Sequence, residues 1–271
     1  MAGCCRFYRI KRKAQNKVMP KRYPALLLAV ALSGAAAYAQ SASQLPDAPT
    51  PATDTPTLRN VPRNLMHDQA GIWTFPVHMN SGGALEGIVF VVAAAGLGAD
   101  DRNIMQNHFH DQNTINHANT ASEGLTGLLG AAPAVFYGIG HLRHDDDAQR
   151  TGVMAGEAIV DSLAVNQVIK ACARRERPTV DNARGKFFAN GVGFDSSFAS
   201  NHSVVAWSSA AVIASEYNGF MTRILVYGLA SGVSVTRIVS RNHFPSDVLV
   251  GSGVGWIIGR YVFRRHNRGQ L

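Results

Sequence analysis

The chain has 271 residues, which suits one large domain or two small ones, and its formal net charge is +8. Eight of the 26 lysine and arginine residues lie within residues 1–39, which contain no aspartate or glutamate. Residues 40–271 therefore balance 18 basic against 18 acidic side chains, and the positive charge does not indicate a nucleic-acid surface. Of the three cysteines, only Cys172 lies outside residues 1–39, which excludes a disulfide within the remaining chain.

Residues 1–39 have the pattern of a secretory signal peptide. A basic segment ends at Arg22, an apolar run covers 25–37, and the sequence Ala-Tyr-Ala at 37–39 is typical of a cleavage site. The alternative is an uncleaved anchor helix, but the apolar run is short for a bilayer span. We therefore expect export across the inner membrane. The protein would be periplasmic, or its active site would lie at the periplasmic face of the membrane.

We predict that residues 40–82 form two segments before the main domain. Residues 40–57 are rich in proline, threonine, alanine and serine, which is typical of a disordered linker. Residues 58–82 predict an N-terminal extension that packs on the core, with a short helix near 61–71 followed by a loop. We expect its apolar residues to contact the main domain: Ile72, Trp73, Phe75 and Val77.

Residues 83–265 predict an all-α domain, a bundle of six helices. Apolar segments rich in alanine, glycine, valine and serine alternate with polar ones, and small residues allow helices to pack closely. No period-two alternation predicts strands. The expected helices cover about 84–99, 122–142, 151–171, 201–216, 221–236 and 246–262.

The predicted helices do not decide whether the domain is embedded in a membrane. Their apolar runs are shorter than the roughly 20 residues that a bilayer span needs, and the mean hydropathy of the chain is −0.02. Acidic residues interrupt them, although membrane bundles also hold buried acids. We favour a soluble or membrane-associated domain on the outer side of the inner membrane. The oligomeric state stays open.

Two polar segments between the helices contain clustered histidines or acids. Residues 100–122 predict a long solvated loop at the rim of the site; its alternative as a metal site would use His108, His110, Asp111 and His117. Residues 144–147, His-Asp-Asp-Asp, predict a tight turn that caps the next helix, with a cation site as the alternative.

Three clusters between 170 and 247 carry side chains suited to phosphate chemistry. In the first, Lys170 ends a predicted helix and Arg177 follows in the next loop, before Pro178. An arginine offers a planar fork to two phosphate oxygens, and a lysine offers a point charge. Taken alone, this cluster is more typical of a solvated basic helix end than of a phosphate site.

The second cluster is Ser200-Asn201-His202 at the start of an apolar helix. Ser200 suits the N-cap position, and the free N–H groups of a first helical turn bind anions. The helix dipole disfavours the cationic form of a histidine there, so His202 would release its proton readily, as a general acid does. The alternative is a surface histidine on a capped helix.

The third cluster consists of Arg237, His243 and Asp247. The sequence Phe-Pro-Ser-Asp at 244–247 predicts a helix start, with proline at the first position. The spacing of four residues would bring Asp247 within reach of a ring N–H of His243. A carboxylate in that place fixes the tautomer and leaves the other ring nitrogen free to attack.

Together, the three motifs resemble the signature of the type 2 phosphatidic acid phosphatase superfamily, which includes bacterial acid phosphatases and vanadium haloperoxidases. They are Lys170-x6-Arg177-Pro178, Ser200-x-His202 and Arg237-x5-His243-x3-Asp247. The resemblance implies the six-helix bundle of that superfamily and its phosphatase activity. It also implies a nucleophile at His243, an orienting carboxylate at Asp247 and a general acid at His202. Phosphate-binding roles then fall to Lys170, Arg177, Ser200, Asn201 and Arg237.

Two positions depart from the family pattern. The second motif usually reads Pro-Ser-Gly-His, whereas this chain has Ala199-Ser200-Asn201-His202; asparagine is the next most tolerant residue where glycine has a positive φ. The third motif usually begins Ser-Arg, and here it is Thr236-Arg237. Arg241 lies too close to His243 for the motif spacing, so we assign phosphate binding to Arg237.

The resulting hypothesis is a metal-independent phosphohydrolase with a phosphohistidine intermediate and no cofactor. Its substrate would be a phosphorylated small molecule, such as a phosphomonoester, or a lipid phosphate or pyrophosphate. One alternative is a vanadium-dependent haloperoxidase, with vanadate bound at His243. The other is a non-catalytic binder of phosphate or a lipid head group, for which Ala199 and Asn201 are the motivation.

Overall fold

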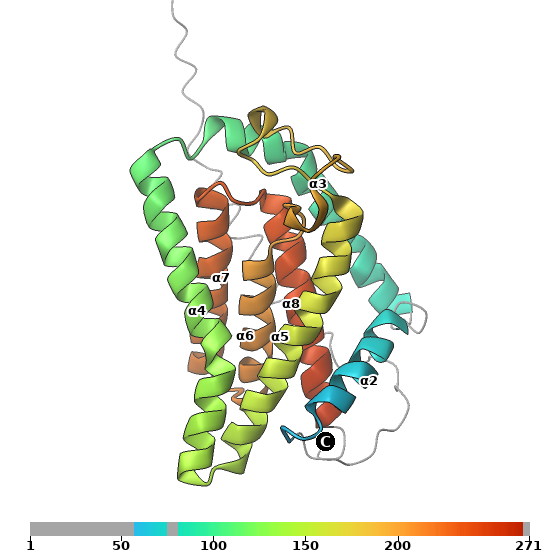
Figure 1. Ribbon diagram of the computed structural model, residues 1–271, viewed down its shortest axis with the longest axis vertical. Coiled ribbons are helices and arrows are strands. Elements are labelled where there is room, and N and C mark those ends of the chain that lie inside the picture. The colour runs from blue at the N-terminus through green and yellow to red at the C-terminus, as the bar shows by residue number, and fades with distance from the viewer. Residues whose placement is uncertain (1–56, 75–80, 268–271) are drawn as a thin grey trace, which may run out of the picture. The chain divides into compact units, whose positions relative to one another are not determined.

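The computed structural model describes residues 57–74 and 81–267, and all regular structure in these ranges is helical (Figure 1). This confirms the predicted all-α class. The described part has seven α-helices rather than six, because the helix near 61–71 is added to the six of the predicted bundle. They are α2 (Val61–Thr74), α3 (Ser81–Asn107), α4 (Gln112–Arg143), α5 (Asp146–Ala173), α6 (Asn201–Glu216), α7 (Phe220–Val239) and α8 (Pro245–His266).

Several predictions concern residues outside these ranges. The signal peptide at 1–39, the linker up to residue 56, and Phe75 and Val77 of the apolar segment all lie there. They stay predictions.

The long loop predicted at 100–122 is wrong. Helix α3 continues to Asn107 and α4 begins at Gln112, so the connection is only four residues long. Asp111 caps α4, because its carboxylate accepts a hydrogen bond from the backbone N–H of Thr114 at 2.8 Å. The polar side chains in this segment are mostly exposed on helix surfaces. Their polarity reflected exposure to solvent rather than a loop.

The tight turn predicted at 144–147 is confirmed. His144 adopts a left-handed conformation with φ 56° and ends α4, and Asp145 caps α5 by accepting a hydrogen bond from Ala148 N at 3.0 Å. Asp146 and Asp147 then lie in the first turn of α5, where acids interact favourably with the helix dipole.

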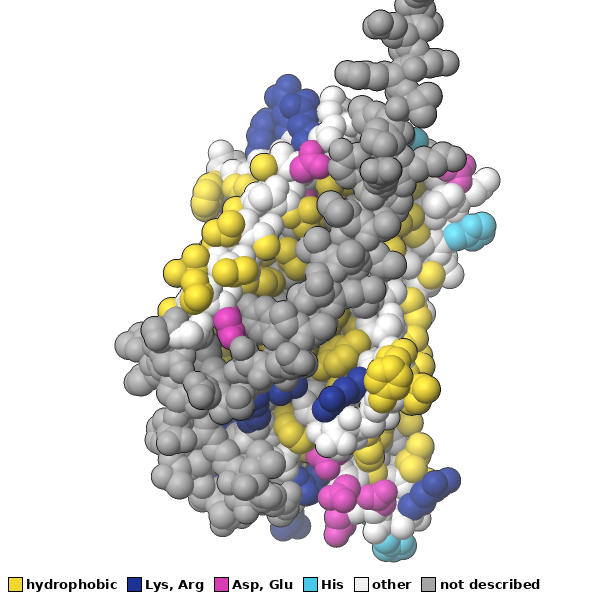
Figure 2. All heavy atoms as spheres, turned by 180° about the vertical axis from the view of Figure 1, so that it is seen from behind, with side chains coloured by type: hydrophobic (Ala, Val, Ile, Leu, Met, Phe, Trp, Pro, Cys, Tyr) yellow, Lys and Arg dark blue, Asp and Glu magenta, His cyan; other side chains and the backbone are white. Residues whose placement is uncertain are grey.

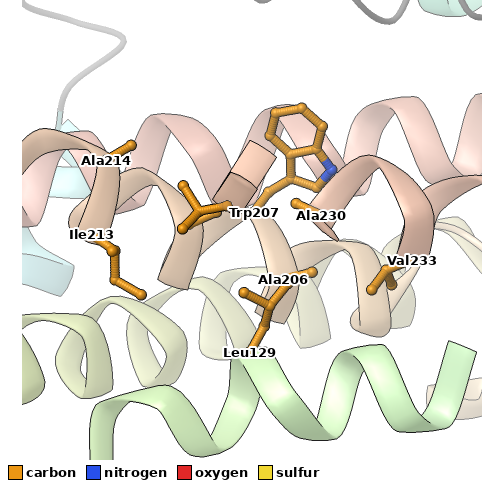
Figure 3. Close-up of a cluster of buried hydrophobic side chains, with 9 residues drawn as sticks. Leu129, Ala206, Trp207, Ile213, Ala214, Ala230 and Val233 are labelled. Carbon is orange, nitrogen blue, oxygen red and sulfur yellow. The ribbon is translucent and has the colours of Figure 1, made fainter. Parts of the chain in front are cut away.

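A buried cluster joins α4, α6 and α7 (Figure 3). Trp207 of α6 lies at its centre, and its indole N–H donates to Ser234 Oγ of α7 at 2.9 Å. The remaining members are small or branched, which permits close packing of these helices. They include Leu129, Ala206, Ile213, Ala214, Ala230 and Val233.

A stripe of three glycines on α8, four residues apart, allows α6 to approach very closely. A Cβ atom at Gly255 would lie 2.4 Å from the carbonyl oxygen of Val204, and one at Gly259 would lie 2.5 Å from that of Ser208. At Gly251 the added atom would lie 2.7 Å from the carbonyl oxygen of Ser200. The stripe therefore sets the distance between α6 and α8 along their contact.

Consecutive helices from α5 onward run in opposite directions (Figure 1). As a result, the C-terminal ends of α5 and α7 meet the N-terminal ends of α6 and α8 at one end of the bundle. The loop at 174–200, which contains two short 3₁₀ turns at Asp181–Ala183 and Gly193–Asp195, covers this end. All three sequence motifs lie at this end of the bundle.

Large apolar side chains are exposed on the outer surfaces of α3, α4 and α7, and Figure 2 shows hydrophobic side chains on the face seen from behind. Five on α3 have about 60% of their surface exposed: Leu85, Ile88, Val89, Val91 and Val92. Within the described residues, one helix, α4, has the length and apolar composition needed to cross a membrane.

Candidate active site

His243 is the buried centre of the site, with 2% of its surface exposed. Its Nδ1 lies 2.7 Å from the carbonyl oxygen of Ser197. A carbonyl only accepts, so Nδ1 carries the proton and Nε2 holds the free lone pair. Burial lowers the pKa of His243 well below its usual value, and Arg237 and Lys170 lower it further. The imidazole is therefore neutral and has a defined tautomer.

The predicted direct hydrogen bond between Asp247 and His243 is wrong. Asp247 Oδ2 lies 3.9 Å from Nδ1, and the Ser197 carbonyl takes the place expected for the carboxylate. Asp247 instead accepts from Ser197 Oγ at 2.5 Å and from the backbone N–H of Phe244 at 2.9 Å. The carboxylate thus holds the residue whose carbonyl orients His243.

Arg175 and Asp101, which the sequence analysis did not assign to the site, support this arrangement. Arg175 Nη1 lies 2.6 Å from Asp247 Oδ1, and its Nη2 lies 2.8 Å from Asp101 Oδ2. Asp101 also accepts hydrogen bonds from the backbone N–H and the hydroxyl of Ser246. Arg175 lies within the first motif, so its place in the sequence could have indicated a role in the site. Asp101 lies 69 residues before Lys170, and no local sequence pattern indicates such a role for it.

Lys170 reaches the site from the last turn of α5. It is 2% exposed, and its Nζ donates to the carbonyl oxygen of Ser196. Burial, with a smaller contribution from the positive charge of Arg177, lowers the pKa of Lys170 to about 8. Its charge is consequently lost as the pH rises through about 8, unless a bound anion holds the proton.

Two arginines from different elements complete the cationic part of the site. Arg177 donates from Nη2 to Asp195 Oδ1 at 2.7 Å and from Nη1 to the carbonyl oxygen of Asn242 at 3.3 Å. Arg237, in the last turn of α7, is 4% exposed, and its Nη1 lies 3.2 Å from Glu123 Oε1. Both arginines lower the pKa of His243, so they lie within electrostatic reach of it.

Ser200 and Asn201 differ in their relation to the site. Ser200 is the N-cap of α6, as the sequence predicted, and its backbone N–H donates to the carbonyl oxygen of Asp247 at 3.2 Å. Asn201 is the first residue of α6 and is not among the residues with positive φ. Its side-chain oxygen accepts from Asn166 Nδ2 of α5 at 2.6 Å. Asparagine therefore fits the backbone where the family pattern has glycine, and its side chain contacts α5.

His202 contacts a carboxylate that the sequence analysis missed. Its Nε2 lies 3.1 Å from both oxygens of Glu123, which comes from α4 and also pairs with Arg237. Burial and then Arg237 lower the pKa of His202, while Glu123 raises it. Glu123 occupies a position between a histidine and an arginine that a phosphate oxygen would also suit. Glu123 lies at the start of the helix that the sequence analysis expected from residue 122, but no neighbouring residue indicated a role in the site.

Arg241 makes structural contacts and does not belong to the group of cations around His243. Its Nη1 donates to the carbonyl oxygen of Met105 at 2.8 Å, and those of His108 and Phe109 lie at 3.4 Å. These carbonyls lie in the last turn of α3 and just after it, where a cation is favourable. The contact is consistent with assigning the motif arginine to Arg237.

The histidines of 100–122 do not gather into a metal site. His110 Nε2 contacts the carbonyl oxygen of Gln106 at 2.9 Å, and Asp111 caps α4. Within the described ranges, the group of side chains placed to hold a metal ion is Asp68, Glu157 and His266, far from this segment in sequence.

One end of this all-α bundle presents three cations and a neutral, oriented imidazole, which are the groups that suit an anion such as a phosphoryl group. Residues 152–270, which contain all three motifs, match the family model of the PAP2 superfamily. Searches among curated proteins and among solved structures gave no match. Members of this superfamily are mostly phosphatases and are often membrane-associated, so the match supports phosphoester hydrolysis of a phosphate-bearing substrate in general.

Proposed function

We propose that the protein is a metal-independent phosphohydrolase that acts through a phosphohistidine at His243. The observation that carries this proposal is the Nδ1–H bond from His243 to the Ser197 carbonyl, which leaves Nε2 as a neutral nucleophile among positive charges. A histidine used only to bind an anion would gain from being protonated, whereas here its surroundings disfavour the proton.

In the first step, the phosphoryl oxygens bind to Lys170, Arg177, Arg237 and the free N–H groups at the start of α6. Nε2 of His243 attacks phosphorus in line as the bond to the leaving oxygen breaks. Positive charge then develops on the imidazole. Its Nδ1–H bond to Ser197 strengthens as that charge develops, because the carbonyl dipole is already oriented.

His202 is the proposed general acid of this step. It gives its proton to the departing alkoxide, and it then takes a proton from the water that attacks the phosphohistidine. Glu123 must release part of the anion site to admit the substrate, while its charge keeps His202 protonated to a higher pH.

The positive charges must contribute most of the rate enhancement. Hydrolysis of a phosphate monoester requires up to ~10²¹-fold acceleration, of which one general acid contributes ~10²–10⁴. Preorganised cations and positioning therefore have to supply the larger part. Three buried or half-buried cations from α5, α7 and the connecting loop match this requirement.

We further propose a lipid phosphate as the substrate, at the periplasmic side of a membrane. Two apolar grooves of about 450 and 480 Å³ lie on the surface, and both are lined by Phe187 and Phe198, next to the second motif. Such grooves suit hydrocarbon chains. The apolar outer surfaces of α3, α4 and α7 also support membrane association.

A lipid preference predicts a large difference between two substrates with the same head group. With EDTA present, we expect kcat/KM for phosphatidic acid to exceed that for glycerol 3-phosphate at least ~100-fold, since burying four methylene groups contributes ~3 kcal/mol. Phosphate release by the protein from residue 40 onward, in detergent, measures this ratio.

A pair of phenylalanines provides the matched comparison. Phe188 lines one groove and is 68% exposed, whereas Phe194 is 70% exposed and lines neither. Phe188→Ser should reduce the ratio, and Phe194→Ser should leave it unchanged. Equal kcat/KM values for both substrates would contradict the lipid assignment and leave the phosphatase assignment intact.

Replacing Glu123 with glutamine should shift the pH profile. Glu123 raises the pKa of His202, so its loss lowers that pKa, and the protonated acid disappears at lower pH. The alkaline limb of kcat should therefore move to lower pH. Bound phosphate keeps Lys170 protonated in the complex, so kcat reports mainly on His202.

Asp146→Asn, which removes an exposed carboxylate at the far end of α5, is the control for a general charge effect. An alkaline limb that stays in place or moves to higher pH in Glu123→Gln would argue against Glu123 as the partner of the acid. KM should fall in the same variant, because the carboxylate no longer competes with the substrate for Arg237.

A further inference from the structure

A second group of buried ionisable side chains lies where α2, α5 and α8 meet, far from the reaction. Asp68 comes from α2, Glu157 from α5 and His266 from the last residue of α8. His266 comes nineteen positions after Asp247 on α8, which is about 28 Å along a helix. This group therefore has no part in the proposed phosphoryl transfer.

The three side chains direct atoms toward one point. His266 Nε2 lies 3.2 Å from Glu157 Oε2 and 3.5 Å from Asp68 Oδ2, and the three atoms lie within 4.8 Å of one another. Two ligand atoms bound about 2.1 Å from a tetrahedral ion lie about 3.4 Å apart. The two separations from His266 Nε2 match that geometry.

None of these three atoms makes a hydrogen bond, although all are buried. Asp68 is fully buried and Glu157 is 1% exposed. Buried polar atoms are nearly always paired, because an unpaired one costs about 1–3 kcal/mol or more when charged. The histidine is close to both carboxylates, yet its N–H direction does not meet the geometry of a hydrogen bond with either.

The other oxygen of each carboxylate is held by a neighbouring side chain. Asn64 Nδ2 donates to Glu157 Oε1 at 2.9 Å, and Arg265 Nη1 lies 2.9 Å from Asp68 Oδ1. This leaves Glu157 Oε2 and Asp68 Oδ2 directed at His266. Such outer partners are typical of metal sites, where they orient the ligating groups.

The local charge also favours a dication. Asp161, one turn after Glu157 on α5, is a third buried carboxyl group; its Oδ1 accepts from the neutral Gln69 at 2.8 Å, and its Oδ2 has no partner. Asp68 and Glu157 against Arg265 leave a charge of −1 when His266 is neutral, and Asp161, whose pKa burial raises to about 7, adds part of a second negative charge. A divalent cation would neutralise this charge.

We propose that Asp68, Glu157 and His266 form a structural site for a divalent transition-metal ion, best matched by Zn²⁺. Two carboxylates and an imidazole are ligands that Zn²⁺ accepts, with water in the fourth position. The ion would fasten α2 to α5 and α8 at the end of the bundle away from His243. The sequence analysis predicted no metal, and the proposed site leaves the reaction metal-independent.

The rival occupant is a proton on His266, which would make the group an ion-pair network without metal. The test uses the full chain with Cys4, Cys5 and Cys172 each replaced by serine, so that no thiol binds the probe. After removal of metal with EDTA, Zn²⁺ alone is added. Bound zinc is counted by elemental analysis, affinity is measured by competition with a chromogenic chelator, and Tm is recorded with and without Zn²⁺.

We expect one tightly bound Zn²⁺ per chain and a higher Tm with Zn²⁺ than with EDTA. Glu157→Gln and His266→Gln should each lower the affinity at least ~100-fold, and Asn64→Ala, which keeps all three ligands, about 10–100-fold. His67→Gln, with an exposed side chain next to Asp68, and His243→Ala should bind as the parent does.

Each remaining outcome overturns the proposal. No tight binding by the parent protein would leave the ion-pair network. Undiminished binding in both ligand variants would place zinc elsewhere, and loss of binding in His243→Ala would place it in the catalytic site. Binding without a change in Tm would exclude a structural role. If the ligand variants do not fold, zinc binding by Asn64→Ala and by the parent protein still distinguishes these outcomes.

Discussion

Replacing His243 with alanine is expected to lower kcat by roughly 10⁶-fold, the scale on which removal of a nucleophile disables a catalytic unit. His243 is buried, its tautomer is set by Ser197, and the surrounding cations remain when it is removed. The variant should therefore still bind phosphate while it releases none. Steady-state phosphate release with EDTA present, together with calorimetric titration of inorganic phosphate, measures both properties.

His117→Ala is the matched control, since His117 is exposed on α4 and has no contact with the site, and its activity should equal that of the parent. Turnover within tenfold of the parent in His243→Ala would refute the phosphohistidine mechanism. A parent protein that binds phosphate without releasing any would instead support the non-catalytic binder. Vanadate-dependent bromide oxidation would support the haloperoxidase.

Replacing Arg175 with methionine is expected to reduce the free energy of unfolding by about 3–5 kcal/mol. Arg175 is 3% exposed and pairs with two carboxylates, Asp101 and Asp247, which would be left buried without it. For a domain of this size, that loss corresponds to a fall in Tm of about 6–20 °C. Thermal and denaturant unfolding measure the change.

The same variant separates a positioning role from a purely structural one. Well below its Tm, Arg175→Met should lose kcat while KM changes little, because Asp247 no longer holds Ser197 and the Ser197 carbonyl no longer fixes His243. Arg175→Lys should recover stability in part, since it keeps the charge but not the fork. Arg174→Met, one residue away and half-buried, should change stability by less than about 0.5 kcal/mol. Full kcat in folded Arg175→Met would show that Arg175 serves stability alone.

Most of the helices were predictable because their apolar stretches are separated by local signals. His144, Asp145, Ser200 and Pro245 act through the backbone of their own turn, and all four end or begin helices as expected. The prediction of a loop at 100–122 was wrong because the polar residues there show no apolar periodicity, which is the pattern that distinguishes an exposed helix from a loop.

The site was predictable to the extent that chemistry follows from residue type and spacing. Spacing of four between His243 and Asp247 correctly placed them about one turn apart. It could not show that the Ser197 carbonyl, 46 residues earlier in the chain, would take the hydrogen bond. Glu123 was missed for the same reason, since its contact with His202 spans 79 residues.

By itself, the sequence determined the all-α class, the superfamily motifs and the identity of the cationic and imidazole side chains, because these depend on local propensity and residue chemistry. Only the tertiary structure decided which carboxylate contacts which base. Helix packing brings Asp101 and Glu123 to the motifs, and brings Asp68 and Glu157 to His266. Those contacts depend on the directions and separations of helices that lie far apart in the chain, which no local pattern specifies.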